Sequence, residues 1–131
     1  MSRMPIIVAL AAALVAAVIA TPARAQTLVE SYTAFLSEAD HFNSNGQRLT
    51  SAAAIIRQDR ANFHRFGRGD PGDEGDRFFA SIDNRAALER MLERGRASPG
   101  AINAIVNRTP LIRVDIYRDA EGPFIRVTVL N

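Results

Sequence analysis

Asp59 is the residue of this chain whose position most clearly points to chemistry. On a helix it lies in the middle of an apolar face, among Ile55, Ile56, Phe63 and Phe66. A carboxylate buried there must be ion-paired, hydrogen-bonded or protonated, because an unpaired buried charge costs several kcal/mol. The sequence favours a structural role, either an ion pair with one of the many arginines or a cap to a neighbouring helix. The alternative is an acid or base with a shifted pKa, which makes Asp59 the one candidate catalytic residue.

A second group of carboxylates lies in a single loop that also contains glycine. Calcium takes about six to eight oxygen ligands, so a loop of this composition suits it. The spacing is not that of an EF-hand, and nearby arginines can neutralise the same charges. We therefore predict no bound metal or other cofactor. If a cation does bind, the candidate ligands are Asp70, Asp73, Glu74 and Asp76.

No other motif for catalysis is present. His41 and His64 are not spaced like metal ligands on a helix, and we expect both on solvated faces. The chain has no cysteine, and all 16 of its Lys or Arg residues are arginine, so thiol and amine nucleophiles are excluded. It has neither a nucleophile elbow nor a phosphate-binding glycine loop. The sequence favours a protein that is not an enzyme.

The first 25 residues have the form of a signal peptide. Arg3 precedes an apolar run over residues 6–20, and Ala23 and Ala25 give the small-x-small pattern of a cleavage site before Gln26. About fifteen apolar residues are too few to span a bilayer, so we expect no transmembrane segment after cleavage. We predict a periplasmic or secreted protein with one domain over residues 26–131.

The charge balance argues against a nucleic-acid partner. Arg3 and Arg24 belong to the leader, and the remaining basic residues only equal the 14 acidic ones. A nucleic-acid-binding domain would keep a net basic footprint. About a hundred residues without cysteine make one small domain that apolar packing alone must stabilise.

The residue pattern predicts an α+β fold with about four short helices. Thr27 and Glu30 resemble a capping box, and the apolar residues that follow have helical spacing, so we expect a first helix to about Asp40. A second helix is expected from Thr50 or Ser51 to about Phe66, and a third from Asp83 to a left-handed Gly95. Ser98 and Pro99 open a fourth.

From Leu111 the apolar period changes from 3.6 to 2, which predicts a C-terminal antiparallel β-hairpin. Aligning its apolar faces pairs Ile116 with Ile125. That register places Asp115 opposite Arg126, as an ion pair, and Tyr117 opposite Phe124, as an aromatic pair. The aliphatic face must be covered by the helices, because a lone hairpin is only marginally stable. The sequence alone does not decide whether residues 47–51 add a third strand to this hairpin.

The outer face of the hairpin is the predicted binding surface, because its residue types are enriched at interfaces. The last strand also leaves an edge to which another strand can add, in a protein partner or in a homodimer, unless a helix or the loop covers it. We therefore predict an exported accessory or binding protein that acts through protein contact. The alternatives are a small periplasmic enzyme or ligand-binding domain using Asp59, and a calcium-stabilised module using the loop at 70–76. The surface residues are Arg113, Asp115, Tyr117, Phe124 and Arg126.

Overall fold

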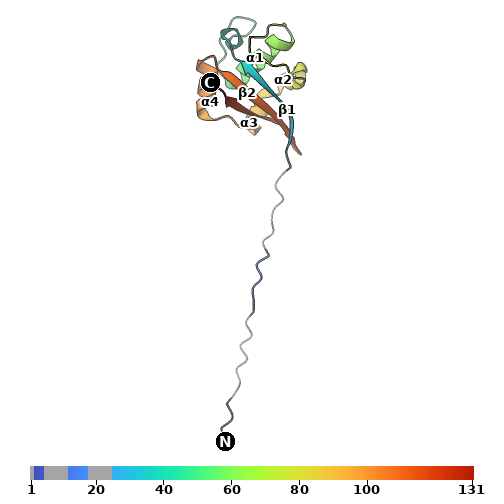
Figure 1. The fold of residues 1–131 in the computed structure, drawn as a ribbon, viewed down its shortest axis with the longest axis vertical. Helices are drawn as coiled ribbons and strands as arrows, with labels where there is room; N and C mark the ends of the chain where they lie inside the picture. The colour runs from blue at the N-terminus through green and yellow to red at the C-terminus, as the bar shows by residue number, and fades with distance from the viewer. Residues whose placement is uncertain (1, 5–11, 18–24) are drawn as a thin grey trace.

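The computed structural model describes residues 2–4, 12–17 and 25–131 (Figure 1). Most of the predicted signal peptide, including Ala23 of its cleavage site, lies outside the described residues, and the signal peptide stays a prediction. Within the described ranges, no helix is long and apolar enough to cross a membrane.

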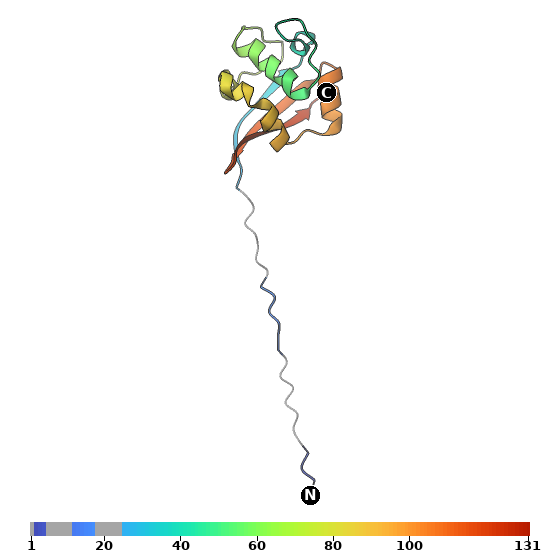
Figure 2. The same ribbon diagram turned by 180° about the vertical axis from the view of Figure 1, so that it is seen from behind.

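The domain is a three-stranded antiparallel sheet with all of its helices on one face (Figures 1 and 2). The strand order is β1-β2-β3, and the core lies between the sheet and the helices. The α+β class is confirmed. The elements are β1 (Thr27–Phe35), the 3-10 turn η1 (Glu38–His41), α1 (Ala52–His64), the 3-10 turn η2 (Phe78–Ala80), α2 (Ile82–Ala86), α3 (Leu88–Arg94), α4 (Pro99–Asn107), β2 (Leu111–Asp119) and β3 (Gly122–Val129).

The predicted first helix over residues 27–40 is wrong, because its first nine residues form β1. Tyr32, Ala34 and Leu36 are buried in alternation, which is the period of a strand. The segment is rich in β-branched and aromatic residues, and distant β2 supplies its hydrogen-bond partners. The sheet therefore has three strands instead of the predicted hairpin alone.

The capping box expected from Thr27 and Glu30 does not form, and a different pair of residues forms one further along the chain. Ser37 and Asp40 form one at η1. The Glu30 carboxylate instead accepts hydrogen bonds from the backbone N–H groups of Arg77 and Phe78. The predicted capping box of Thr27 and Glu30 is therefore wrong: Glu30 does accept from backbone N–H groups, but in a segment more than forty residues away.

The remaining helices are close to their predicted positions. The Ser51 hydroxyl caps α1 by accepting from Ala54 N–H, and Ser98 caps α4 in the same way through Ala101 N–H. The predicted third helix is two helices, α2 and α3, which meet at Ala87. Its cap is Ser81 and not Asp83.

The hairpin has the predicted register, with Asp115 opposite Arg126 and Tyr117 opposite Phe124. The two rings are stacked with their centroids 5.5 Å apart. Among the ion pairs formed by the described residues, the predicted Asp115–Arg126 pair does not occur. Asp115 accepts from Ser31 Oγ at 2.6 Å and from Arg113 Nε at 2.9 Å, while the Arg126 guanidinium lies over the Tyr117 ring.

The outer edge of β3, predicted to be open, is covered at its centre. Arg96 N–H donates to the Ile125 carbonyl at 3.0 Å, and Val127 N–H donates to the Arg96 carbonyl at 2.9 Å. A partner that adds a strand therefore meets occupied hydrogen-bonding groups in the middle of this edge. At the start of β3, Arg94 Nη1 donates to the Pro123 carbonyl at 2.9 Å, so the predicted strand-addition contact has only the C-terminal end of β3 available.

Gly95 precedes Arg96, the residue that covers the β3 edge, and glycine is needed there for a reason other than the predicted left-handed conformation. Its φ is −95°, so it is not left-handed. A Cβ at this position would lie 1.7 Å from the Ile125 carbonyl oxygen, which belongs to the backbone and cannot move aside. Glycine is required because α3 must approach β3 closely.

Substituting Gly95 should therefore destabilise the domain. We expect Gly95→Ala to lower the free energy of unfolding by about 3 kcal/mol, because the added methyl separates α3 from β3. The matched control is Gly100→Ala, in α4, where the nearest atom is 4.0 Å away. There alanine should be neutral or stabilise by up to about 1 kcal/mol. Urea denaturation measures both, and equal effects would contradict the packing explanation.

Candidate metal centre

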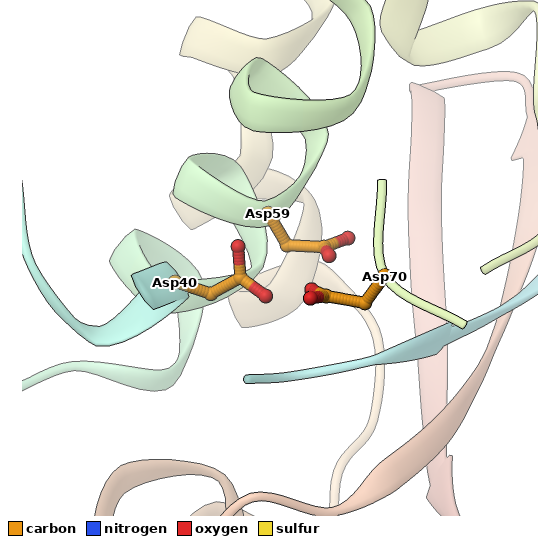
Figure 3. A group of neighbouring side chains, drawn as sticks. All are labelled: Asp40, Asp59 and Asp70. Atoms are coloured by element: carbon orange, nitrogen blue, oxygen red, sulfur yellow. The ribbon is translucent and has the colours of Figure 1, made fainter. Parts of the chain in front are cut away.

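Three carboxylates converge beneath the loop that follows α1 (Figure 3). Asp40 comes from η1, Asp59 from α1 and Asp70 from the loop. One oxygen from each lies within 4.8 Å of the others. Asp40 and Asp59 are each only 1% exposed, so the cluster lies at the boundary between the core and the loop.

Asp40 is held firmly by its neighbours. Its Oδ2 accepts from Ser37 N–H at 3.0 Å and from Ser37 Oγ at 3.2 Å. Its Oδ1 accepts from Asn62 Nδ2 at 2.8 Å, and Asn62 Oδ1 in turn accepts from Gln58 Nε2. Burial nevertheless raises the pKa of Asp40, because these hydrogen bonds only partly offset the loss of water.

Asp59 is buried on α1 as predicted, and it forms the predicted ion pair with an arginine. Its Oδ2 accepts from Arg60 Nε at 2.8 Å. Its Oδ1 is buried and has no hydrogen-bond partner. Burial raises the pKa of Asp59 well above its ordinary value, because Arg60 opposes the shift only in part and the charges of Asp40 and Asp73 add to it.

Arg60 is fully buried and connects this cluster to a fourth carboxylate, that of Asp76. Its guanidinium carbon lies 4.2 Å from the centroid of Tyr32 and 4.7 Å from that of Phe63. Its Nη1 donates to Asp76 Oδ1 at 2.8 Å, which makes Arg60 the shared partner of two buried carboxylates. One guanidinium therefore faces more negative charge than it can neutralise.

The acidic residues of the loop have separate roles. Asp73 accepts from Phe35 N–H and Asp70 N–H, and Glu74 accepts from the N–H and hydroxyl of Thr33. The bonds from Thr33 lower the pKa of Glu74. Asp76 serves Arg60 and Phe79 N–H. Of the predicted metal candidates, Asp70 alone joins the cluster, while the others fasten the loop to β1 and α1.

The two histidines are not solvated, contrary to the prediction. His41 is 1% exposed, and its ring nitrogens lie 2.7 and 2.8 Å from the carbonyl oxygens of Ser37 and Ile105. The His64 side chain is 13% exposed, with Nε2 at 2.7 Å from Asp76 Oδ1. Both rings hold separate elements together.

A pocket of about 420 Å³ opens beside the cluster. Asp40 and Asp70 belong to its wall, whereas Asp59 does not. The wall also contains an aromatic ring, a hydroxyl, an amide and a guanidinium, those of Phe66, Ser44, Gln58 and Arg68. Asp70 is half-buried and Asp40 is buried, so groups bound in this pocket reach the cluster through Asp70, the one partly exposed carboxylate of the three.

The comparisons with known proteins find no relative. No protein-family model, curated protein or solved structure matches this chain. The chemistry of the site must therefore be inferred from its own geometry.

The predicted binding surface lies elsewhere in the molecule. Arg113, Asp115 and Tyr117 alternate with the buried residues of β2, so they lie on the sheet face that the helices leave bare. Arg126 lies on the same face of β3. Phe124 is only 7% exposed, because its ring packs against Tyr117 and the Arg94 guanidinium.

Sequence reasoning missed Asp40 as a member of the acidic cluster. No local pattern joins residues 40, 59 and 70, and the capping role of Asp40 was concealed by the incorrect first helix. The available signal was Ser37 followed by Asp40, which is a capping-box spacing with Asp in place of Glu.

The raised pKa values predict an unusual pH dependence of stability without metal. A carboxyl group whose pKa is raised by folding stabilises the protein at acidic pH, and that stabilisation is lost as pH rises through the folded pKa. Asp59→Asn should keep an acceptor for Arg60 and remove the titrating group. We expect the variant to gain stability relative to the wild type as pH rises from about 4 to neutral.

Thermal melting of both proteins in chelator measures this difference. Comparing the pair cancels the contributions of other carboxylates, including Glu74, whose shift has the opposite sign. A difference that does not change with pH would show that Asp59 does not titrate in this range.

Proposed function

We propose that this protein binds a divalent cation, calcium in the first instance, through Asp40, Asp59 and Asp70. The observation that carries the proposal is Asp59 Oδ1, a buried carboxylate oxygen without a hydrogen-bond partner beside two further carboxylates. Such an oxygen needs a hydrogen-bond donor, a proton or a cation, because Arg60 bonds only the other oxygen of the same group, and two nearby carboxylates favour the cation.

The separation of the three carboxylates supports calcium. Calcium–oxygen distances are about 2.4 Å, so two oxygens on one ion are at most about 4.8 Å apart. The oxygens of the three residues lie within 4.8 Å of one another. A single ion at their centre can therefore contact all three after small side-chain movements.

Asp59 supports a cation site better than it supports catalysis. A general acid or base must reach its substrate, and Asp59 does not line the neighbouring pocket. An ion held behind Asp40 and Asp70 needs no such access. It would join η1, α1 and the loop, which are already connected through Asn62: its side chain donates to Asp40 and its carbonyl accepts from Arg68 N–H.

The predicted leader supports the choice of ion. An exported protein meets calcium outside the cytosol, where binding modules have dissociation constants of about 10⁻⁴–10⁻³ M. Three carboxylates with one shared arginine suit this range better than the higher charge of a tight cytosolic site. The proposed protein is an exported module that calcium stabilises.

Calcium should raise the melting temperature of the purified protein. At a free concentration of a hundred times Kd, the expected stabilisation is about 2.7 kcal/mol. Asp59→Asn and Asp70→Asn should each abolish most of the response, since each removes one of three charged ligands. The matched control Asp83→Asn changes an exposed aspartate of α2 and should respond as the wild type does.

Melting curves in calcium and in chelator, with calorimetric titration, measure these responses. Identical wild-type curves in both solutions would contradict the proposal and leave a proton as the partner of Asp59. A response to magnesium or manganese without one to calcium would correct the ion.

A second candidate function is protein contact through the bare face of the sheet, in its simplest form as a homodimer. The observation that favours it is the arrangement of the helices, which cover the opposite face and leave this one without described cover (Figures 1 and 2). Arg113, Asp115 and Arg126 alternate in charge across β2 and β3, so a two-fold copy can pair opposite charges.

Reversing the charge of Arg126 should weaken such a dimer. We expect Arg126→Glu to raise the dimer dissociation constant about tenfold or more, because it places like charges across the interface. Arg90→Glu, at an exposed position of α3, is the control. Phe124→Ala is unsuitable as a surface probe, because Phe124 is buried and its loss destabilises the fold. Sedimentation equilibrium that finds only monomer in all three proteins would contradict the dimer.

A further inference from the structure

The proposed ion would have incomplete coordination on the side that faces the pocket. Three carboxylates supply only part of the six to eight or so oxygen ligands that calcium takes. Asp40 and Asp70 line the pocket, and the remaining protein ligand, Asp59, lies behind them. The open coordination positions therefore face a space of about 420 Å³, which is large enough for a small ligand as well as water.

The pocket wall combines uncharged polar groups with an exposed aromatic ring. The Ser44 hydroxyl makes no hydrogen bond to the described protein, and the Gln58 carboxamide uses only its nitrogen, toward Asn62. Phe66 is 41% exposed, which is unusual for so large an apolar side chain. Hydroxyl and amide groups beside an aromatic face match a ligand that has hydroxyl groups on one side and C–H groups on another.

The charges near the ion favour a neutral ligand. Four carboxylates, those of Asp40, Asp59, Asp70 and Asp76, face two charges from calcium and one from Arg60. These groups leave one negative charge, and the Arg68 guanidinium in the pocket wall, 5.8 Å from the Phe66 centroid, balances it. The site therefore offers a carboxylate or phosphate ligand no net attraction.

We propose that the pocket binds a neutral sugar, with two adjacent hydroxyl groups coordinating the ion and the C–H face of the ring against Phe66. This inference rests on the proposed cation site. Hydroxyl oxygens complete the calcium coordination without adding charge, and the remaining hydroxyls can pair with Ser44 and Gln58. The pocket would then be a calcium-dependent carbohydrate site.

The test separates ion binding from sugar binding. Calcium affinity is first measured by calorimetry for the wild type, Phe66→Ala and the control Ile82→Ala, which removes another exposed apolar side chain far along the sequence, in α2. Saturation-transfer NMR then follows D-glucose, D-galactose and D-mannose, in calcium and in chelator. Inorganic phosphate, followed by calorimetry, is the anionic probe.

We expect at least one of the sugars to bind in calcium and not in chelator. Phe66→Ala should weaken it about tenfold while leaving calcium affinity unchanged, and Ile82→Ala should change neither. Calcium binding with no response from any sugar would overturn the carbohydrate inference and leave the cation site intact. Preferential binding of phosphate would overturn the inference that the ligand is neutral. Absence of calcium binding would overturn both the site and this inference.

Discussion

The buried guanidinium of Arg60 is the interaction on which the rest of this structure depends. It lies between the rings of Tyr32 and Phe63 and bonds both Asp59 and Asp76. Through these contacts it joins β1, α1 and the loop before η2 in one network. Burying a charged group is costly, so a network of this kind persists only when nearly every group has a partner. Three buried atoms of this network have no hydrogen-bond partner, Asp59 Oδ1, Arg60 Nη2 and Tyr32 Oη, and of these only Asp59 Oδ1 belongs to the carboxylate cluster.

The same loop also covers the free edge of β1. Glu74 and Asp73 accept hydrogen bonds from Thr33 and Phe35 N–H groups that would otherwise be open to another strand. Arg96 covers the centre of the β3 edge at the other side of the sheet. Two of the four acidic residues that resembled a metal loop in the sequence, Asp73 and Glu74, are thus used to close the sheet. The cation site that we propose uses another of the four, Asp70, with partners from two other segments.

Much of the fold was predictable because several segments carry local signals that tertiary contacts do not oppose. The hairpin register, including the Tyr117–Phe124 pair, follows from strict alternation on both strands. The caps at Ser51 and Ser98 follow from side-chain chemistry within one turn. The first strand was not predictable in this way. Its apolar residues fit both a helical and an extended period, and only pairing with β2 decides between them.

By itself, the sequence predicted that Asp59 would be buried, because the apolar residues around it repeat at helical spacing, and the many arginines favoured an ion pair there. It also excluded thiol and lysine chemistry, because those residue types are absent. Tertiary structure alone decided that Asp40 and Asp70 lie beside Asp59, since these residues are 19 and 11 positions away on different elements. The physical reason is that a site built across elements depends on long-range packing, which no local pattern of residues records.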